Sequence, residues 1–226
     1  MPTQFLRVVF SPGVQPDKWF TRFDERVRHW RVAGAQAEDP LKYILAGAAD
    51  VALLRVGAAG VDKNTYHSVD LYEEQLGVAA PKDHPVKVME RVRYAELAGE
   101  MEMYVTPADG EVDVAAVKEA LGVVAANVGV VIAPRPLLRA INMRGVVHRD
   151  LLDATSAGST RVIAVWLREK DSDEVQDFVG VCRGRKSDSS RQHNPQQKSK
   201  AKKKAAQQNS APVTGPAAKN RPRKKR

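Results

Sequence analysis

The residues best suited to chemistry follow a short apolar run near the amino terminus. Residues 6–10 are β-branched, aromatic or otherwise apolar apart from one arginine, which predicts a buried strand. Ser11 and Gly13, with a proline between them, break that strand, and Pro16 suits the first position of a helix. A strand that turns through a small loop into a helix leaves backbone N–H groups free. With the Ser11 hydroxyl, they predict a site for a carboxylate or another small anion. An ordinary strand–loop–helix unit with an empty loop fits the same pattern.

No other pattern in the sequence predicts catalysis or metal binding. Glycine-rich phosphate loops, dinucleotide fingerprints and Gly-x-Ser-x-Gly motifs do not occur. His84 lies between an aspartate and a proline, as in a turn, and Cys182 lies on the apolar face of a predicted helix. We therefore predict no metal, no cofactor and no enzymatic activity. The five histidines lack metal-ligand spacing: His29, His67, His84, His148 and His193.

The elements that position the first loop alternate between strand and helix. Apolar residues at helical spacing in 16–27 predict a helix, and 31–36 predict a second strand. Asp39 and Pro40 mark the start of a helix that runs to about Ala48. Residues 50–56 predict a third strand. This β-α-β-α-β order predicts a parallel sheet with helices on its faces.

The rest of the folded sequence predicts a second α/β lobe. Its turn-rich block 81–85 indicates that the chain crosses between lobes near Pro81, and it crosses back near Arg161. We therefore predict a first lobe from 1–81 with 161–191 and a second lobe from 82–160. The further predicted strands are 69–74, 76–80, 101–105, 129–133, 146–151 and 161–167. Further helices are predicted at 94–98, after a cap at Asp113, and at 136–143. A last helix contains Val175 and Phe178 and follows the acidic residues 171–174, which suit a helix start.

Positive charge is concentrated at the carboxyl terminus. Residues 192–226 contain eleven of the 36 lysines and arginines and none of the 27 acidic residues. The remaining chain, with 25 basic residues, is slightly acidic and is not predicted to be a nucleic-acid-binding domain. Val213 is the only large apolar residue in 192–226, so this segment predicts a disordered basic tail.

Composition also bears on location. A single cysteine excludes an intrachain disulfide, and residues 1–7 do not resemble a signal peptide. The longest apolar stretch, 120–133, is interrupted by Asn127 and is shorter than the roughly 20 residues that span a bilayer. We expect a cytoplasmic protein without a membrane partner.

Several short segments between residues 5 and 191 follow one another in an order that can be compared with a known family. They are the loop Ser11-Pro12-Gly13-Val14, Asp39-Pro40-Leu41, Asp50-Val51-Ala52-Leu53, Leu71-Tyr72-Glu73-Glu74, Lys82-Asp83-His84-Pro85, 94–98, 123–134, and Val165-Trp166 with Phe178. In this order they resemble the effector-binding domain of LysR-type transcriptional regulators. The resemblance implies a two-lobed clamshell of the type 2 periplasmic-binding-protein kind, with two crossover strands, and homodimers. Because the first strand begins near residue 5, we expect no winged helix-turn-helix. Asn127 stands where the family has a glycine.

Open α/β sheets bind ligands at loops beyond their strand ends, so we predict that both lobes contribute to an effector site. The first lobe is expected to supply Ser11, Gly13, Val14, Gln15, Arg55 and Gly57, and the second Thr106, Asn127 and Gly129. The predicted function is the binding of a small, anionic effector by a non-enzymatic protein.

The basic tail supports an alternative. Its unopposed cations would neutralise phosphates, giving sequence-independent binding to nucleic acid with the clamshell as a scaffold. A tail that only improves solubility fits equally well. The residues concerned are Lys198, Lys200, Lys202, Lys203, Lys204, Arg221, Arg223, Lys224, Lys225 and Arg226.

Overall fold

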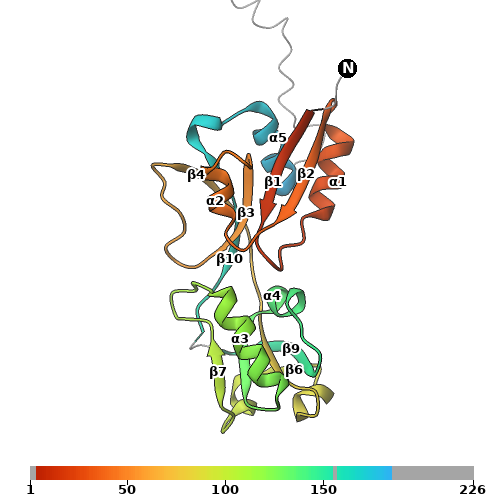
Figure 1. Cartoon of the computed structure of the whole chain (residues 1–226), viewed down its shortest axis with the longest axis vertical. Coiled ribbons are helices and arrows are strands. Elements are labelled where there is room, and N and C mark those ends of the chain that lie inside the picture. The colour runs from red at the N-terminus through yellow and green to blue at the C-terminus, as the bar shows by residue number, and fades with distance from the viewer. Residues whose placement is uncertain (1–3, 155–156, 185–226) are drawn as a thin grey trace, which may run out of the picture. The chain divides into compact units, whose positions relative to one another are not determined.

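The computed structural model describes residues 4–154 and 157–184, so the predicted basic tail lies outside the described residues. Within the described ranges, the strands form two five-stranded sheets, the first and second sheets (Figure 1). The first sheet has the order β2 (Trp30–Gln36), β1 (Gln4–Phe10), β3 (Val51–Val56), β10 (Arg161–Leu167), β4 (Tyr66–Glu73). The second has the order β6 (Arg91–Arg93), β9 (Val146–Leu152), β5 (Leu76–Pro81), β8 (Val130–Pro134), β7 (Glu102–Val105).

The first sheet has a parallel part and an antiparallel part. Strands β2, β1 and β3 are parallel, as the alternating sequence pattern predicts, whereas β10 is antiparallel to β3 and to β4. Helices α1 (Asp17–Arg26) and α5 (Asp173–Cys182) bury Phe23 and Phe178 on one face. Helix α2 (Pro40–Leu45) buries Ile44 on the other. Strand β3 therefore has apolar side chains on both faces.

The second sheet packs against helices α3 (Val114–Ala125) and α4 (Arg135–Ala140) on one face. Three short 3-10 segments complete the described structure: η1 (Pro85–Val88) and η2 (Tyr94–Leu97) beside the second sheet, and η3 (Arg168–Lys170) before α5. Strand β6 and segment η1 were not predicted from the sequence.

The first crossing between the sheets differs from the prediction. Strand β5 was expected in the first lobe, with the crossing near Pro81, but its residues pair with β8 and β9 of the second sheet. The chain therefore crosses at Glu74 and Gln75, between β4 and β5. The proline-rich block after Pro81 is instead the turn into η1. The return crossing lies between β9 and β10, where the sequence predicted it.

Helix α3 begins with the cap that the sequence predicts. The Asp113 carboxylate accepts hydrogen bonds from the N–H groups of Ala115 (2.9 Å) and Ala116 (3.0 Å). We expect Asp113→Ala to lower the free energy of unfolding by about 1 kcal/mol, because both N–H groups lose this partner. Urea denaturation measures the loss. Glu119→Ala, on the exposed side of the same helix, is the control, and an equal loss in both variants would contradict the capping role.

Candidate functional site

The loop after β1 forms the turn that the sequence indicates, but it is covered. The Ser11 N–H donates to the Leu53 carbonyl (2.9 Å), and the Val14 N–H donates to the Ser11 carbonyl (3.1 Å). Gly13 has a φ of 89°, which favours glycine. Ser11, Gly13 and Val14 are buried, whereas Gln15 is exposed. The loop is therefore anchored to β3, and most of it is withdrawn from solvent.

Helix α4 of the second sheet covers this loop. A Cβ atom on Gly13 would lie 2.8 Å from the backbone nitrogen of Leu137 and 2.8 Å from the carbonyl carbon of Pro136. Only a residue without a side chain allows two backbones to approach so closely. The start of α4 therefore covers the loop at Gly13, and the amides of Ser11 and Val14 are already bonded within the first lobe.

Arg55, predicted as a ligand contact, is held by a carboxylate of the chain itself. Its Nε and Nη2 atoms donate to the two carboxylate oxygens of Glu74, the latter at 2.8 Å. Its Nη1 atom donates to the Pro12 carbonyl at 3.2 Å. The side chains of Arg55 and Glu74 are only 4% and 0% exposed. A buried ion pair of this kind depends on complete hydrogen bonding.

Thr160 completes this group on the return crossing. Its hydroxyl donates to Glu74 Oε2 at 3.1 Å, and its carbonyl accepts from the Glu74 N–H at 2.9 Å. Glu74 lies on the first crossing and Thr160 directly precedes β10, so the ion pair connects both crossings to β3. We call Pro12, Arg55, Glu74 and Thr160 the crossing network. Sequence reasoning did not find Glu74 or Thr160, although an arginine in a strand that is otherwise apolar needs a partner.

Gly57 makes a second direct contact between the sheets. Its N–H donates to the Glu111 carboxylate (3.1 Å), and the Ala58 N–H donates to the Asp109 carbonyl (2.7 Å). A Cβ atom on Gly57 would overlap that carbonyl oxygen. Thr106 lies close to this contact, fully buried, with its hydroxyl donating to the Ile132 carbonyl (3.3 Å). Its hydroxyl is therefore used inside the second lobe.

Asn127 and Gly129 lie at the opposite end of the second sheet. They precede β8, whereas the last residue of β8, Pro134, pairs with Leu76 next to the crossing. The structure therefore does not bring these two residues together with the Ser11 loop, Arg55 and Gly57, because strand direction places them at the far edge. Their part in ligand binding stays a prediction. Asn127 has a φ of 71°, which asparagine tolerates in place of glycine.

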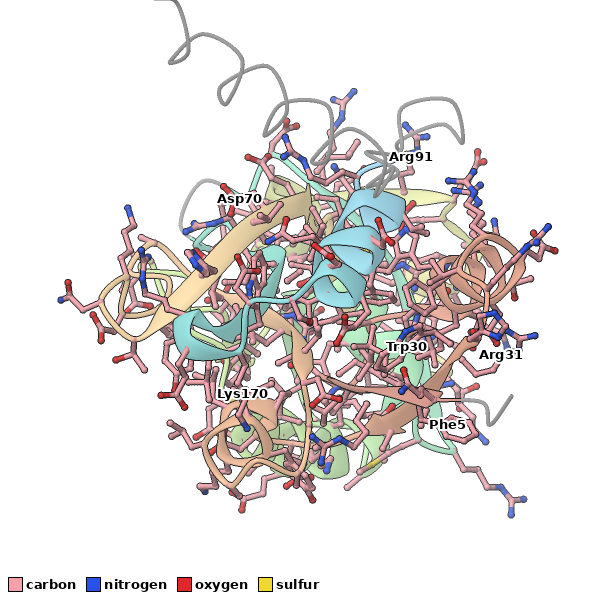
Figure 2. All side chains as sticks on the ribbon, turned by 90° about the horizontal axis from the view of Figure 1, so that it is seen from above. Phe5, Trp30, Arg31, Asp70, Arg91 and Lys170 are labelled. Carbon is pink, nitrogen blue, oxygen red and sulfur yellow. The ribbon has the colours of Figure 1, made fainter. Side chains whose placement is uncertain are left out.

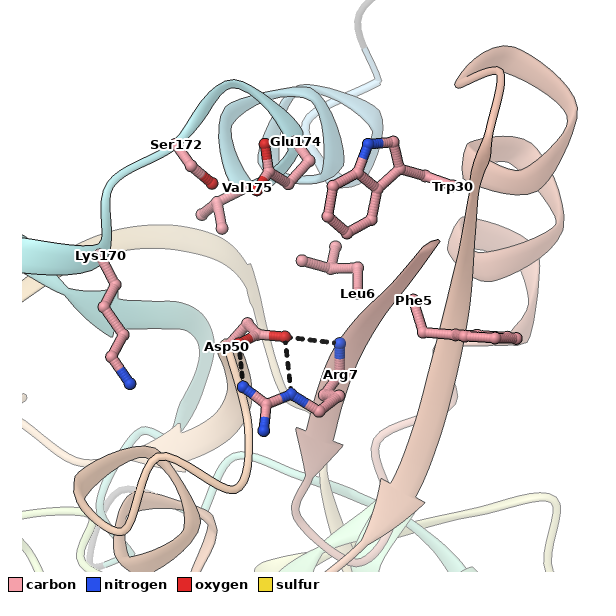
Figure 3. A pocket seen from close by; sticks show the side chains of 9 residues that line it. All are labelled: Phe5, Leu6, Arg7, Trp30, Asp50, Lys170, Ser172, Glu174 and Val175. Carbon is pink, nitrogen blue, oxygen red and sulfur yellow. Dashed lines mark hydrogen bonds and ion pairs between the residues drawn. The ribbon is translucent and has the colours of Figure 1, made fainter. Parts of the chain in front are cut away.

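Two surface pockets in the described part of the chain lie away from the junction of the sheets. Asn127 and Gly129 help to line one of about 270 Å³. There His84 accepts from the Val86 N–H (3.1 Å) and lies 3.0 Å from Glu100, as suits a turn residue. The other pocket, of about 310 Å³, lies at the start of β1 (Figures 2 and 3). Its lining residues are Phe5, Leu6, Arg7, Trp30, Asp50, Lys170, Ser172, Glu174 and Val175.

Two of the four charged residues that line the larger pocket, Arg7 and Asp50, form an ion pair with each other. Arg7 donates through Nε to Asp50 (3.0 Å) and through Nη1 to the Gly47 carbonyl (2.7 Å). Figure 3 shows this ion pair on one side of the pocket and Trp30 with Val175 on the other. Because the pocket lies where β1 begins, it is separated from the Ser11 loop by the length of that strand.

Tyr72, on β4 near the crossing network, makes the stability of the fold depend on pH in the alkaline range. Burial, and next the charge of Glu74, raise its pKa to about 12 from 10.0. The folded chain thus keeps a proton that the unfolded chain loses, so this contribution to stability is full below pH 10 and disappears between about pH 10 and 12. Tyr72 is 37% exposed, so solvent reduces the effect.

We expect Tyr72→Phe to flatten the fall in unfolding free energy between pH 9.5 and pH 11, because no phenol remains at this position to ionise on unfolding. Urea denaturation at several pH values measures the slope. Tyr43→Phe, on α2, is the control for loss of a hydroxyl. A slope that Tyr72→Phe leaves at the wild-type value would contradict the assignment.

The structure also bears on the predictions for Cys182, for metal binding and for membrane-spanning helices. Cys182 packs against the core of the first sheet, and burial raises its pKa to about 12, so the thiol is a packing group as predicted. The described residues contain no cluster of three or more metal-binding side chains. No helix among them is both long enough and apolar enough to cross a membrane.

Comparison with known proteins gives matches at the level of structure. No family model and no curated protein matches the chain. The effector-binding domain of BenM with its effector benzoate superimposes with a TM-score of 0.59 at 16% identity, covering 81% of this chain and 92% of that one. The chain has the fold of a LysR-type effector-binding domain. The fold predicted from the sequence is thereby confirmed.

Two further structures agree with this LysR-type effector-binding fold. CbnR, a LysR family transcriptional regulator, has a TM-score of 0.56 at 15% identity, over 81% of this chain and 70% of that chain. The reduced form of OxyR has a TM-score of 0.56 at 20% identity, over 81% of this chain and 96% of that chain. At these identities the likeness concerns architecture, and a site must be argued from this chain's own residues.

Proposed function

We propose that this chain binds a small anionic effector where its two sheets meet and that it performs no catalysis. The observation that carries the proposal is Arg55, a guanidinium at the end of β3, buried between the Ser11 loop and both crossings. Arginine presents a planar fork that matches carboxylate geometry. BenM, which has the same fold, is described with benzoate, a carboxylate. Ser11, Gly57 and the start of α4 surround the same junction.

Ligand entry requires the sheets to separate, because Gly13 and Gly57 contact the second lobe directly. The two crossings, which connect β4 to β5 and β9 to β10, are the segments about which such a movement can occur. Hinges of this kind consist of a few residues between rigid elements. We therefore propose that the described structure is the closed state and that an effector binds to an opened one.

Thermal-shift and calorimetric screening of the full chain tests this proposal. The panel contains aliphatic carboxylates, aromatic carboxylates and amino acids. A ligand at 100 times its Kd should stabilise the protein by about 2.7 kcal/mol. The response should disappear in Arg55→Gln/Glu74→Gln, which removes both buried charges, and persist in Arg139→Gln, an exposed arginine on α4. A panel without any hit, or hits that the double variant retains, would overturn the proposal.

The composition of residues 192–226 supports a second candidate function. Their eleven cations and lack of acidic residues favour binding to nucleic acid through phosphates. Binding should weaken steeply as salt increases and should be lost when 192–226 is deleted. Fluorescence anisotropy with DNA and RNA oligomers measures both effects, and binding that survives the deletion would exclude the tail.

A further inference from the structure

Glu74 occupies Arg55 in the way that a carboxylate ligand would. Both Glu74 oxygens accept hydrogen bonds, one from Nε and one from Nη2, so the Nε–Nη2 edge of the guanidinium is filled. The remaining nitrogen, Nη1, is directed to the Pro12 carbonyl. A second carboxylate cannot make the Nε and Nη2 contacts while Glu74 makes them. An effector that binds this edge of Arg55 must therefore replace Glu74.

The position of Glu74 gives such a replacement a structural consequence. Glu74 lies on the first crossing and is bonded to Thr160 on the return crossing through both its side chain and its backbone. The same arginine fixes the Ser11 loop through Pro12. When Glu74 leaves Arg55, the side-chain connection between β3 and both crossings is lost. Occupation of Arg55 and the state of the crossings are thereby linked.

We propose that Glu74 is a tethered substitute for the carboxylate of the effector, and that the effector binds by displacing Glu74 from Arg55. This inference rests on the proposed function and specifies its ligand. The proposed ligand carries a carboxylate, because its two oxygens repeat the contacts of the Glu74 carboxylate with Nε and Nη2. A spherical anion such as chloride cannot satisfy both donors in the same way.

The experiment uses acetate as the probe and full-length protein, so that the basic tail contributes equally to every variant. Melting temperatures are recorded against increasing sodium acetate, with sodium chloride replaced to keep the ionic strength constant. Glu74→Gln keeps the size of the side chain but removes its charge, and leaves Arg55 to bind acetate. Glu73→Gln, the exposed neighbour at the end of β4, is matched to it in net charge.

We expect Glu74→Gln to be stabilised at an acetate concentration about tenfold lower than wild type, since a hydrogen-bonded charge pair is worth at least that factor. Arg55→Gln/Glu74→Gln should lose this response. Thr160→Val, which removes one hydrogen bond from Glu74 and keeps both charges, should shift the midpoint in the same direction by less. It provides the test if Glu74→Gln does not fold.

The outcomes separate this inference from the function on which it rests. Equal acetate responses in Glu74→Gln and Glu73→Gln, or an unchanged midpoint in Thr160→Val, would overturn the tethered-carboxylate inference even if the ligand panel yields an Arg55-dependent effector. A panel without hits, together with a clear acetate response in Glu74→Gln alone, would show that Arg55 accepts a carboxylate in place of Glu74 and would remove the proposed effector function. Both responses together support both proposals.

Discussion

Replacing Glu74 with alanine should lower the free energy of unfolding by about 3–5 kcal/mol, the range for breaking one side of a buried ion pair. The loss is large because Arg55 is 4% exposed and cannot turn to water while the sheets remain in contact. Two of its nitrogen atoms would lose their acceptors, and the Thr160 hydroxyl would lose its own. Urea denaturation at neutral pH, with the slope checked for two-state behaviour, measures the change.

A double variant distinguishes the missing charge partner from the missing side-chain volume. Arg55→Met/Glu74→Leu fills the same space with apolar groups and leaves no buried charge, so it should recover most of the lost stability. Glu73→Ala, on the exposed position next to Glu74, should change stability by less than about 0.5 kcal/mol. If Glu74→Ala lowered the free energy of unfolding by no more than Glu73→Ala, the crossing network would not stabilise the fold.

Substituting Gly57 with valine should force the two sheets apart at their second contact. A Cβ atom at this position overlaps the Asp109 carbonyl oxygen, which is backbone and cannot rotate away. We expect a loss of about 3 kcal/mol or more, from overpacking together with the hydrogen bonds made by the Gly57 and Ala58 amides. Hydrogen exchange should show faster exchange in peptides that cover 57–60 and 107–111.

Gly122→Ala is the matched control for that substitution. Gly122 lies in helix α3, and nothing lies within 4 Å of a Cβ atom placed there. Alanine should therefore stabilise the helix by roughly 0.5–1 kcal/mol. Wild-type exchange rates in Gly57→Val would contradict the close approach of the sheets that the structure describes.

The sequence was sufficient to predict elements whose signal is local. The strand before Ser11 and the cap at Asp113 are both present where residue type and spacing placed them. Strand β5 was assigned to the wrong sheet, because an apolar run carries no information about which distant strands it pairs with. Its partners, β8 and β9, lie about 50 to 75 residues further along the chain, as the pairs Ala79 with Val131 and Gly77 with Asp150 show.

In the candidate site, too, local features could be predicted from the sequence and contacts between distant segments could not. Ser11, Gly13, Val14, Arg55 and Gly57 lie around one junction because the first and third strands are parallel neighbours, which the β-α-β-α-β pattern predicts. Closure of that junction depends on Glu74 and on α4, which belong to other parts of the chain. The sequence of the Ser11 loop therefore gives no sign that they cover it. Asn127 and Gly129 were placed in the site without knowledge of the direction of β8. Pairing alone fixes that direction.

The arrangement of β10 has a consequence for synthesis of the chain. Strand β4 bonds to β10, which also bonds to β3, so β10 fills the space between two strands made some 90 to 110 residues earlier. The second sheet needs only residues 76–152, which emerge from the ribosome as one continuous stretch. A nascent chain that has not yet reached Arg161 would hold β3 and β4 with open edges, which are templates for aggregation. The strands within residues 4–73 must therefore wait, incompletely paired, until β10 has been made.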